Sequence, residues 1–269
     1  MTVDSRRWTE AAMVADEGMM ALANERFQAE GATFIRNRQV PHIRDANHVR
    51  NVRASTPGEL ERLLSRMEEE FAGFPHRCFR VDYRTPPLLE ARLALEGYKR
   101  GESLFLVLAG EPAGGAKPHD IRPLESESDW RAYARLRQMD WQEYVGKQGR
   151  AFDDTEARAM REMVEVTRAK CPPLRYWLGY VDGEPCAYLC SWEGIDGVGQ
   201  VEDVFTHPEY RGRGLAKALL HHAVADCRAH GAGPVTIVAD PGDTPKQIYA
   251  SMGFRPVSVQ RVYWRMVEA

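Results

Sequence analysis

Apolar residues recur along the chain at the spacings of helices and strands, and clusters of turn residues separate the segments. In the first half, this pattern predicts a helix over about 4–28, a second helix that begins after Thr56, and a strand over 77–83. The second helix has Thr56 as a possible N-cap, Pro57 in its first turn and Glu59 three residues after Thr56. Its buried stripe is expected to comprise Leu60, Leu63, Leu64, Met67 and Phe71.

The second half of the chain predicts a longer alternation of strands and helices. The Asp182-Gly183 pair is a strong hairpin signal between two runs of strand-forming residues. In order, we expect a strand at 119–124, helices over about 128–146 and 154–168, strands at 175–181 and 185–192, a strand that ends at a glycine-rich helix start, a buried strand, a short helix after Thr244, and a last strand over 258–266. The order is therefore β-α-α-β-β-β-α-β-α-β.

One pattern occurs twice. A helix, Gly97-Tyr98 and an apolar strand are matched later by a helix, Gly253-Phe254 and the last strand. The first copy has a single glycine where the second has RGRGLA, and it has Leu93 at the place of Tyr249. We interpret the first copy as degenerate and non-catalytic. The alternative is that helix-glycine-aromatic-strand is a common connection and that the first half is a different α+β cover.

Gly and Pro cluster at 111–118, where the apolar periodicity also lapses. We therefore predict that this segment is a linker, that residues 1–110 form the degenerate domain, and that residues 119–269 form the catalytic domain. A length of 269 residues is comfortable for two domains.

Composition and charge narrow the class of protein. Hydrophobic residues make up 43% and charged residues 28% of the chain, which is typical of a soluble globular protein. The first residues lack the apolar core of a signal peptide, and the five cysteines form no CxxC pair, so we expect reduced thiols and a cytoplasmic location. A net charge of -3 gives no general attraction to nucleic acid, and we expect no membrane partner. The histidines lack metal-ligand spacing, so no metal is predicted.

Arginines are concentrated between residues 36 and 53, where Asp45 is the single acid. This segment has two interpretations. One is a surface for an anionic partner, and the other is a solvated surface that pairs with the acidic helix after Thr56.

The stretch from Val204 to Ala216 carries the most specific signal. It runs from an apolar strand through a turn into a glycine-rich helix start. Such a junction presents unbonded N–H groups and a partial positive charge, so it suits an anion. Gly212 and Gly214 leave room for a phosphate near the backbone, and Arg211 and Arg213 add charge. The spacing is neither GxxxxGK[ST] nor GxGxxG, which argues against a nucleoside triphosphate and against a dinucleotide.

The spacing [QR]xxGx[GA], matched by Arg211, Gly214 and Ala216, resembles the pyrophosphate-binding signature of the GNAT superfamily of N-acetyltransferases. The resemblance implies an α+β fold, with a mixed, mostly antiparallel sheet flanked by helices, and a related or GNAT-like N-terminal domain. It also implies acetyl-CoA as the cosubstrate. The residues expected to bind it are Phe205, Thr206, Arg211, Gly212, Arg213, Gly214, Leu215 and Ala216.

Acetyl transfer to an amine needs a proton acceptor, and Glu202 and Asp203 are the candidates. Strand side chains alternate, so we expect the two to face opposite sides of the sheet and only one to face the acceptor. Glu202 is preferred because similar family members carry a glutamate early on this strand. The alternative is that either carboxylate balances Arg211 or Arg213. Backbone N–H groups near Phe205 and Thr206 are expected to stabilise the oxyanion.

Tyr249 is the candidate proton donor to the leaving thiolate. It lies in IYASMGF, which resembles the YxxxGF segment of the family, whose tyrosine directs its hydroxyl at the CoA sulfur. The alternative is a tyrosine packed beneath the strand. Trp141 and Tyr144 are candidates for the acceptor pocket, although aromatic residues at helical spacing also suit a core.

The expected function is therefore acetyl-CoA-dependent N-acetylation of a primary amine by direct transfer through a tetrahedral intermediate. A small-molecule amine is favoured over a protein lysine, and the chain is expected to be a monomer or homodimer. The alternatives are a non-catalytic acyl-CoA-binding sensor or scaffold, and a transferase of a longer acyl group.

Overall fold

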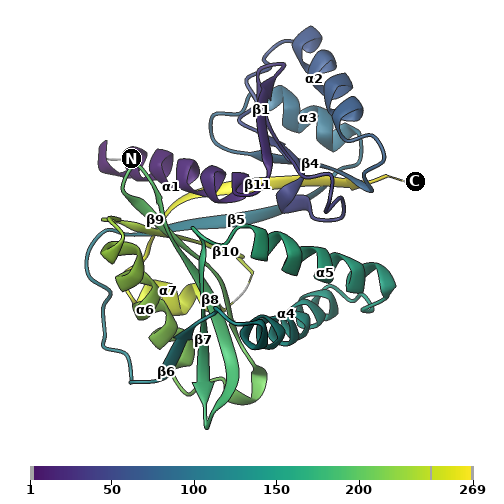
Figure 1. Ribbon diagram of the computed structural model, residues 1–269. Coiled ribbons are helices and arrows are strands. Elements are labelled where there is room, and N and C mark those ends of the chain that lie inside the picture. The colour runs from purple at the N-terminus through teal and green to yellow at the C-terminus, as the bar shows by residue number, and fades with distance from the viewer. Residues whose placement is uncertain (1–2, 243, 268–269) are drawn as a thin grey trace. The chain divides into compact units, whose positions relative to one another are not determined.

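The computed structural model describes residues 3–242 and 244–267, and its backbone forms two compact units (Figure 1). Unit 1 is built from the described parts of Met1–Met19 and Phe105–Val257, and unit 2 from those of Met20–Leu104 and Ser258–Ala269. Two strands, β5 (Lys99–Leu108) and β11 (Arg255–Met266), have residues in both units.

Unit 1 contains the expected order of elements. They are β6 (Asp120–Pro123), α4 (Glu127–Lys147), α5 (Asp154–Ala169), β7 (Arg175–Val181), β8 (Glu184–Ile195), β9 (Val198–Thr206), the short helix η2 (Pro208–Tyr210), α6 (Leu215–Ala229), β10 (Val235–Ala239), α7 (Pro245–Ser251) and the start of β11. Its strands lie side by side in the order β5-β10-β9-β8-β7-β6. Neighbours from β6 to β9 are antiparallel, and β9 and β10 are parallel. The expected mixed, mostly antiparallel α+β sheet is confirmed.

Helices cover the two faces of the sheet in unit 1. On one face, the Tyr133 ring of α4 lies 5.0 Å from the rings of Tyr176 and Tyr188. On the other face, Asp226 of α6 accepts a hydrogen bond from Ser191. Helix α1 (Val3–Ala21) adds Ala12 and Met13 to a buried cluster with residues of β5.

Unit 2 contains a smaller sheet with its own core. Its elements are β1 (Glu25–Ala29), β2 (Ala32–Arg36), the short helix η1 (Arg44–Ala46), β3 (His48–Arg50), α2 (Pro57–Glu70), β4 (His76–Val81), α3 (Pro87–Leu95), the start of β5 and the rest of β11. The strand order is β1-β2-β3-β4-β11. Thr56 and Glu59 form the expected capping box of α2, and Leu60, Leu63, Leu64, Met67 and Phe71 enter the core.

The first helix is shorter than its sequence pattern predicts. It ends at Ala21, and residues 25–29 form strand β1 instead of the last helical turns. Ala23 has a φ of 58°, which a right-handed helix cannot contain, so the chain turns there and Phe27 stacks on Phe34 of β2. The prediction was wrong because polar and apolar residues of β1 also fit helical spacing.

The repeated pattern has a structural counterpart. The order α2-β4-α3-β5 parallels α6-β10-α7-β11. The N–H of Tyr98 bonds the carbonyl of Leu93 at 3.0 Å, and the N–H of Phe254 bonds that of Tyr249 at 3.1 Å. The division into domains at 111–118 stays a prediction. In the structure, α1 clusters with unit 1 and the end of β11 with unit 2.

The arginine-rich segment is only partly a surface. Arg36 forms ion pairs with Glu25 and with Glu70 of α2, as the second interpretation expects. Arg50, by contrast, is buried. In the described part of the chain, no helix is both long and apolar enough to cross a membrane.

Candidate active site

Strand β9 contains a bulge at the two candidate carboxylates. Phe205 pairs with Tyr188, and Glu202 pairs with Cys190. Asp203 and Val204 therefore lie opposite the single residue Leu189 of β8. Asp203 has a φ of 58°, in the left-handed region that side chains other than glycine rarely adopt. The extra residue bends the strand and interrupts its ladder.

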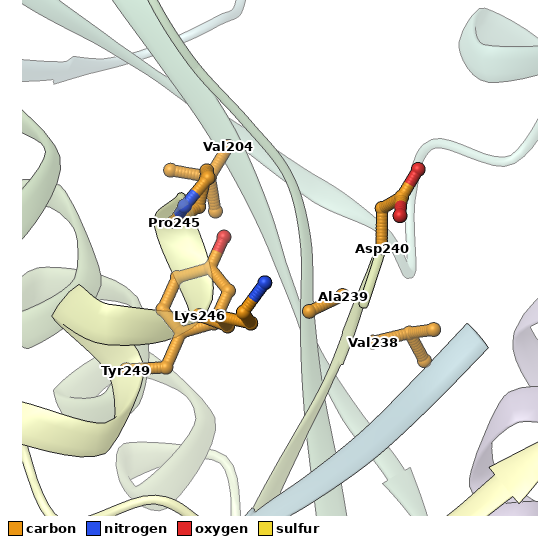
Figure 2. Close-up of a pocket in the computed structure, with 7 residues that line it drawn as sticks. All are labelled: Val204, Val238, Ala239, Asp240, Pro245, Lys246 and Tyr249. Carbon is orange, nitrogen blue, oxygen red and sulfur yellow. The ribbon is translucent and has the colours of Figure 1, made fainter. Parts of the chain in front are cut away.

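The ladder between β9 and β10 ends just before this bulge. Its last paired residues are Val201 and Ile237, and both strands continue beyond that pair. A cavity of about 160 Å³ lies there, between the two strands and α7. It is lined by Val204, Val238, Ala239, Asp240, Pro245, Lys246 and Tyr249 (Figure 2).

Glu202 bridges the two strands where they part. Its Oε1 accepts hydrogen bonds from the backbone N–H of Val238 and from Gln200 Nε2, both at 3.0 Å. Burial raises the pKa of the Glu202 carboxyl well above its usual value, and the negative charges of Asp203 and Asp16 act in the same direction. A carboxyl group with a raised pKa is better matched to proton transfer near neutral pH.

Asp203 lies on the same face as Glu202, so the expected alternation was wrong here. Cys190 pairs with Tyr176 on one side and with Glu202 on the other, which places these three side chains on the α4 face. The Tyr176 hydroxyl donates to Asp203 Oδ2 at 2.5 Å, and Arg137 of α4 lies 3.9 Å from Asp203 Oδ1. The left-handed residue of the bulge removes the alternation that a regular strand would have.

The start of α6 is open to an anion. Gly214 is the N-cap, with a φ of 91° and no side-chain capping bond, so the first N–H groups of the helix remain available. A Cβ at Gly212 would meet no atom within 4 Å. Arg213 donates to the carbonyl of Glu209 at 3.3 Å. This backbone arrangement fits a pyrophosphate group.

Residues 130–254 match the model of the acetyltransferase (GNAT) family. This part of the chain is therefore similar to GNAT acetyltransferase domains. Members of this family are acyltransferases. A comparison with curated proteins finds no match.

Solved structures share the fold of the chain. A GCN5-related N-acetyltransferase from Kribbella flavida has a TM-score of 0.67 and 17% identity, over 96% of each chain. A functionally unknown conserved protein from Staphylococcus epidermidis has a TM-score of 0.71 and 14% identity, over 92% of this chain and 96% of the other. A tandem GNAT protein from the clavulanic acid biosynthesis pathway has a TM-score of 0.56 and 14% identity, over 82% and 76%.

Tyr249 lines the cavity from α7. Its side chain is 4% exposed, and its ring lies 6.2 Å from that of Phe254. Figure 2 shows the hydroxyl directed towards the gap between β9, which carries Val204, and β10, which carries Ala239. Its role as proton donor stays a prediction, and its position is compatible with that role.

The other expected cosubstrate residues lie along the end of β9 and the turn that follows. Phe205 is buried and lies 5.5 Å from the ring of Tyr188. The Thr206 carbonyl accepts from Arg211 Nε at 3.0 Å, and Arg211 also forms an ion pair with Glu143 of α4. The Arg211 side chain is therefore held by Thr206 and Glu143. Leu215 is buried in the first turn of α6.

Trp141 and Tyr144 form an aromatic pair on α4, with ring centroids 5.6 Å apart. The Trp141 Nε1–H donates to Glu156 of α5 at 2.8 Å, which fixes the indole between the two helices. Tyr144 is 38% exposed. The pair is thus only partly core, and its part in an acceptor pocket stays a prediction.

Sequence patterns missed several residues of this region. Lys246 and Asp240 line the cavity, and Lys246 Nζ donates to the carbonyl of Pro241. Lys246 stands three residues before Tyr249 on a helix, and that spacing could have placed it on the same face. Tyr176 reaches Asp203 from β7 and Arg137 reaches it from α4, and no local signal predicts such contacts. Among the described residues, no cluster of His, Cys, Asp or Glu is arranged to hold a metal ion.

Proposed function

We propose that the chain is an N-acetyltransferase that moves the acetyl group of acetyl-CoA to a primary amine. The cavity between β9 and β10 is the observation that carries this proposal. It combines Tyr249 on one wall, the bulge of β9 on the other, and the uncapped N-terminus of α6 after the same strand. A ligand with a narrow arm and a diphosphate suits these features, because the arm would enter the cavity and the diphosphate would bind at the N-terminus of α6.

The residues fit acetyl-CoA on structural grounds. The parted strands offer backbone N–H and C=O groups to the amides of the pantetheine arm, next to Val204 and Val238. The N–H groups from Gly212 to Ala216 would hold the pyrophosphate, with Arg213 nearby. When bound, acetyl-CoA supplies the acetyl group, and its thiol is the leaving group.

Glu202 accepts a proton from the amine, directly or through water, and so makes the nitrogen nucleophilic. The new bond joins that nitrogen to the acetyl carbonyl carbon, the nitrogen releases its second proton to solvent, and the bond from this carbon to sulfur breaks. Backbone N–H groups at Val204, Phe205 and Thr206 stabilise the oxygen while it carries negative charge. Tyr249 gives its proton to the sulfur, and solvent then restores the hydroxyl.

A small-molecule amine is the proposed acceptor, in preference to a protein lysine. Trp141 and Tyr144 would form one aromatic wall for it on the α4 face, where Glu202 also lies. We further propose that the protein acts in the cytoplasm, as a monomer or homodimer.

The test measures thiol release from acetyl-CoA with a broad panel of amines, and repeats it with succinyl-CoA and a longer acyl-CoA. Preference for acetyl-CoA with at least one amine supports the proposal. Binding of acetyl-CoA without thiol release from any amine supports a sensor instead, and preference for another thioester supports transfer of a longer acyl group.

Tyr249→Phe tests the proton donor. Loss of a positioned acid is expected to lower kcat by about 10²-fold or more, with acetyl-CoA affinity nearly intact. Tyr180→Phe in β7 is the matched control, because its ring faces Arg122 and lies outside the cavity. An unchanged kcat in Tyr249→Phe removes this residue from the mechanism.

A further inference from the structure

The backbone of Asp203 is the most constrained point of the candidate site. Asp203 has a φ of 58° within a strand, although an ordinary strand residue has a negative φ. Aspartate tolerates the left-handed region better than most residues but still prefers to leave it. Contacts of its side chain must therefore help to hold it there.

Two residues from different elements make those contacts. Tyr176 of β7 is 4% exposed, and its hydroxyl donates to Oδ2 of Asp203. Arg137 of α4 places Nη2 at 3.9 Å from Oδ1. Each carboxylate oxygen of Asp203 thus faces a different partner, and the two partners approach from the sheet and from the covering helix.

Arg137 is itself fixed by neighbours. Its Nη1 donates to Asp140 Oδ2 at 2.7 Å and to the Tyr188 hydroxyl at 3.2 Å, and that hydroxyl donates to Asp140 at 2.8 Å. The charged groups around Asp203 are therefore Arg137, Asp140 and Glu202, with the hydroxyl groups of Tyr133, Tyr176 and Tyr188 beside them. Burial raises the pKa of Tyr176 well above its ordinary value, so its hydroxyl remains a donor.

From this geometry we infer that Arg137 and Tyr176 are positioning residues, which hold Asp203 in the left-handed conformation and so keep the cosubstrate gap between β9 and β10 open. Asp203 then acts through its backbone, and Glu202 alone accepts the proton. The inference rests on the proposed function for the identity of the ligand. It assigns different tasks to two neighbouring carboxylates on one face.

Substitutions of Asp203 separate a conformational role from a proton-accepting role. Asparagine adopts the left-handed region and can accept from Tyr176 but not also from Arg137, so Asp203→Asn is expected to lower kcat by no more than about tenfold, with an unchanged pH profile. Asp203→Ala lacks both properties and is expected to weaken acetyl-CoA binding by about tenfold, the scale of a lost bond to a charged group. A large loss of kcat in Asp203→Asn, with acetyl-CoA affinity intact, would overturn the inference and make Asp203 the base.

Tyr176→Phe tests the positioning contact without turnover. Amide hydrogen exchange over residues 202–206 is expected to become faster, and acetyl-CoA binding to weaken by about tenfold for the lost hydrogen bond. Tyr180→Phe, from the same strand, is the matched control and should change neither. Unchanged exchange in Tyr176→Phe would overturn the inference, whether or not the wild-type protein acetylates any amine. Failure of the proposed function shows separately, as absence of thiol release by the wild-type protein.

Discussion

Glu202→Gln should lower activity and raise stability, because one buried carboxyl group controls both. Glutamine keeps an acceptor oxygen for the N–H of Val238, which the Glu202 carboxylate binds at 3.0 Å, so the strands should stay joined at this point. Loss of a general base lowers kcat by about 10²- to 10⁴-fold, or ~2.7–5.5 kcal/mol in the barrier. Glu202→Ala is the informative contrast, because it also leaves the Val238 N–H without its partner, at a cost of ~1–3 kcal/mol in stability.

The stability effect has a definite sign. The pKa of Glu202 is raised in the folded state, so its contribution to stability is complete below the unfolded value of about 4.3 and is lost as pH rises towards the folded value. Within that window the wild-type protein loses ~1.4 kcal/mol per pH unit relative to Glu202→Gln. The variant should therefore be more stable at pH 8 and similar at pH 4. Urea unfolding curves at both pH values measure this difference.

The same pKa governs the rate. The free enzyme has a competent base only above the folded pKa of Glu202, so kcat/KM should fall about tenfold per pH unit below it. Protonation of the amine acceptor lowers kcat/KM of the wild-type protein and of Glu202→Gln alike, so it cancels in the ratio of the two values. The pH at which the stability difference levels off should match the pH at which the ratio of kcat/KM values does. Two clearly different pH values would refute the assignment of Glu202 as the base.

Two further predictions concern the anion site and the acceptor. Gly214→Ala forces a side chain into a φ of 91°, and Gly231→Ala does the same at 97° after the other end of α6, so each should lose ~1–2 kcal/mol of stability. Only Gly214→Ala should also weaken acetyl-CoA binding in a titration, and equal affinities would contradict the proposed pyrophosphate site. Trp141→Phe loses the 2.8 Å bond to Glu156 and should raise the KM for the amine several-fold without changing that for acetyl-CoA. An unaltered amine KM argues against Trp141 as a wall of the acceptor pocket.

The sequence predicted the elements of unit 1 well because their signals are local. Asp182 and Gly183 have the positive φ values of a tight hairpin turn, and Gly214 has the left-handed φ that lets a backbone close in on an anion. Such signals depend on a few adjacent residues. The resemblance of IYASMGF to the YxxxGF segment likewise singled out Tyr249, which lines the cavity from α7.

The wrong prediction for Asp203 has a different origin, because its orientation depends on contacts far apart in the sequence. The bulge of β9 has no marker in DVF, since aspartate in a strand does not itself specify a positive φ. It is set by Tyr176 and Arg137, which are 27 and 66 residues away along the chain. The prediction therefore assumed that side chains alternate along β9 as in a regular strand, and it placed Glu202 and Asp203 on opposite faces of the sheet.

The early end of the β9-β10 ladder has a consequence for the lifetime of the protein. Beyond Val201 and Ile237 the two strands no longer pair with each other, and the Val238 N–H is bonded by the Glu202 side chain instead. A ligand that binds in this gap links β9 to β10. Its concentration therefore changes the free energy of unfolding of the protein. A ligand present at a hundred times its Kd adds ~2.7 kcal/mol to the free energy of unfolding. Resistance to proteolysis should therefore follow the supply of acyl donor, even when no acceptor amine is present.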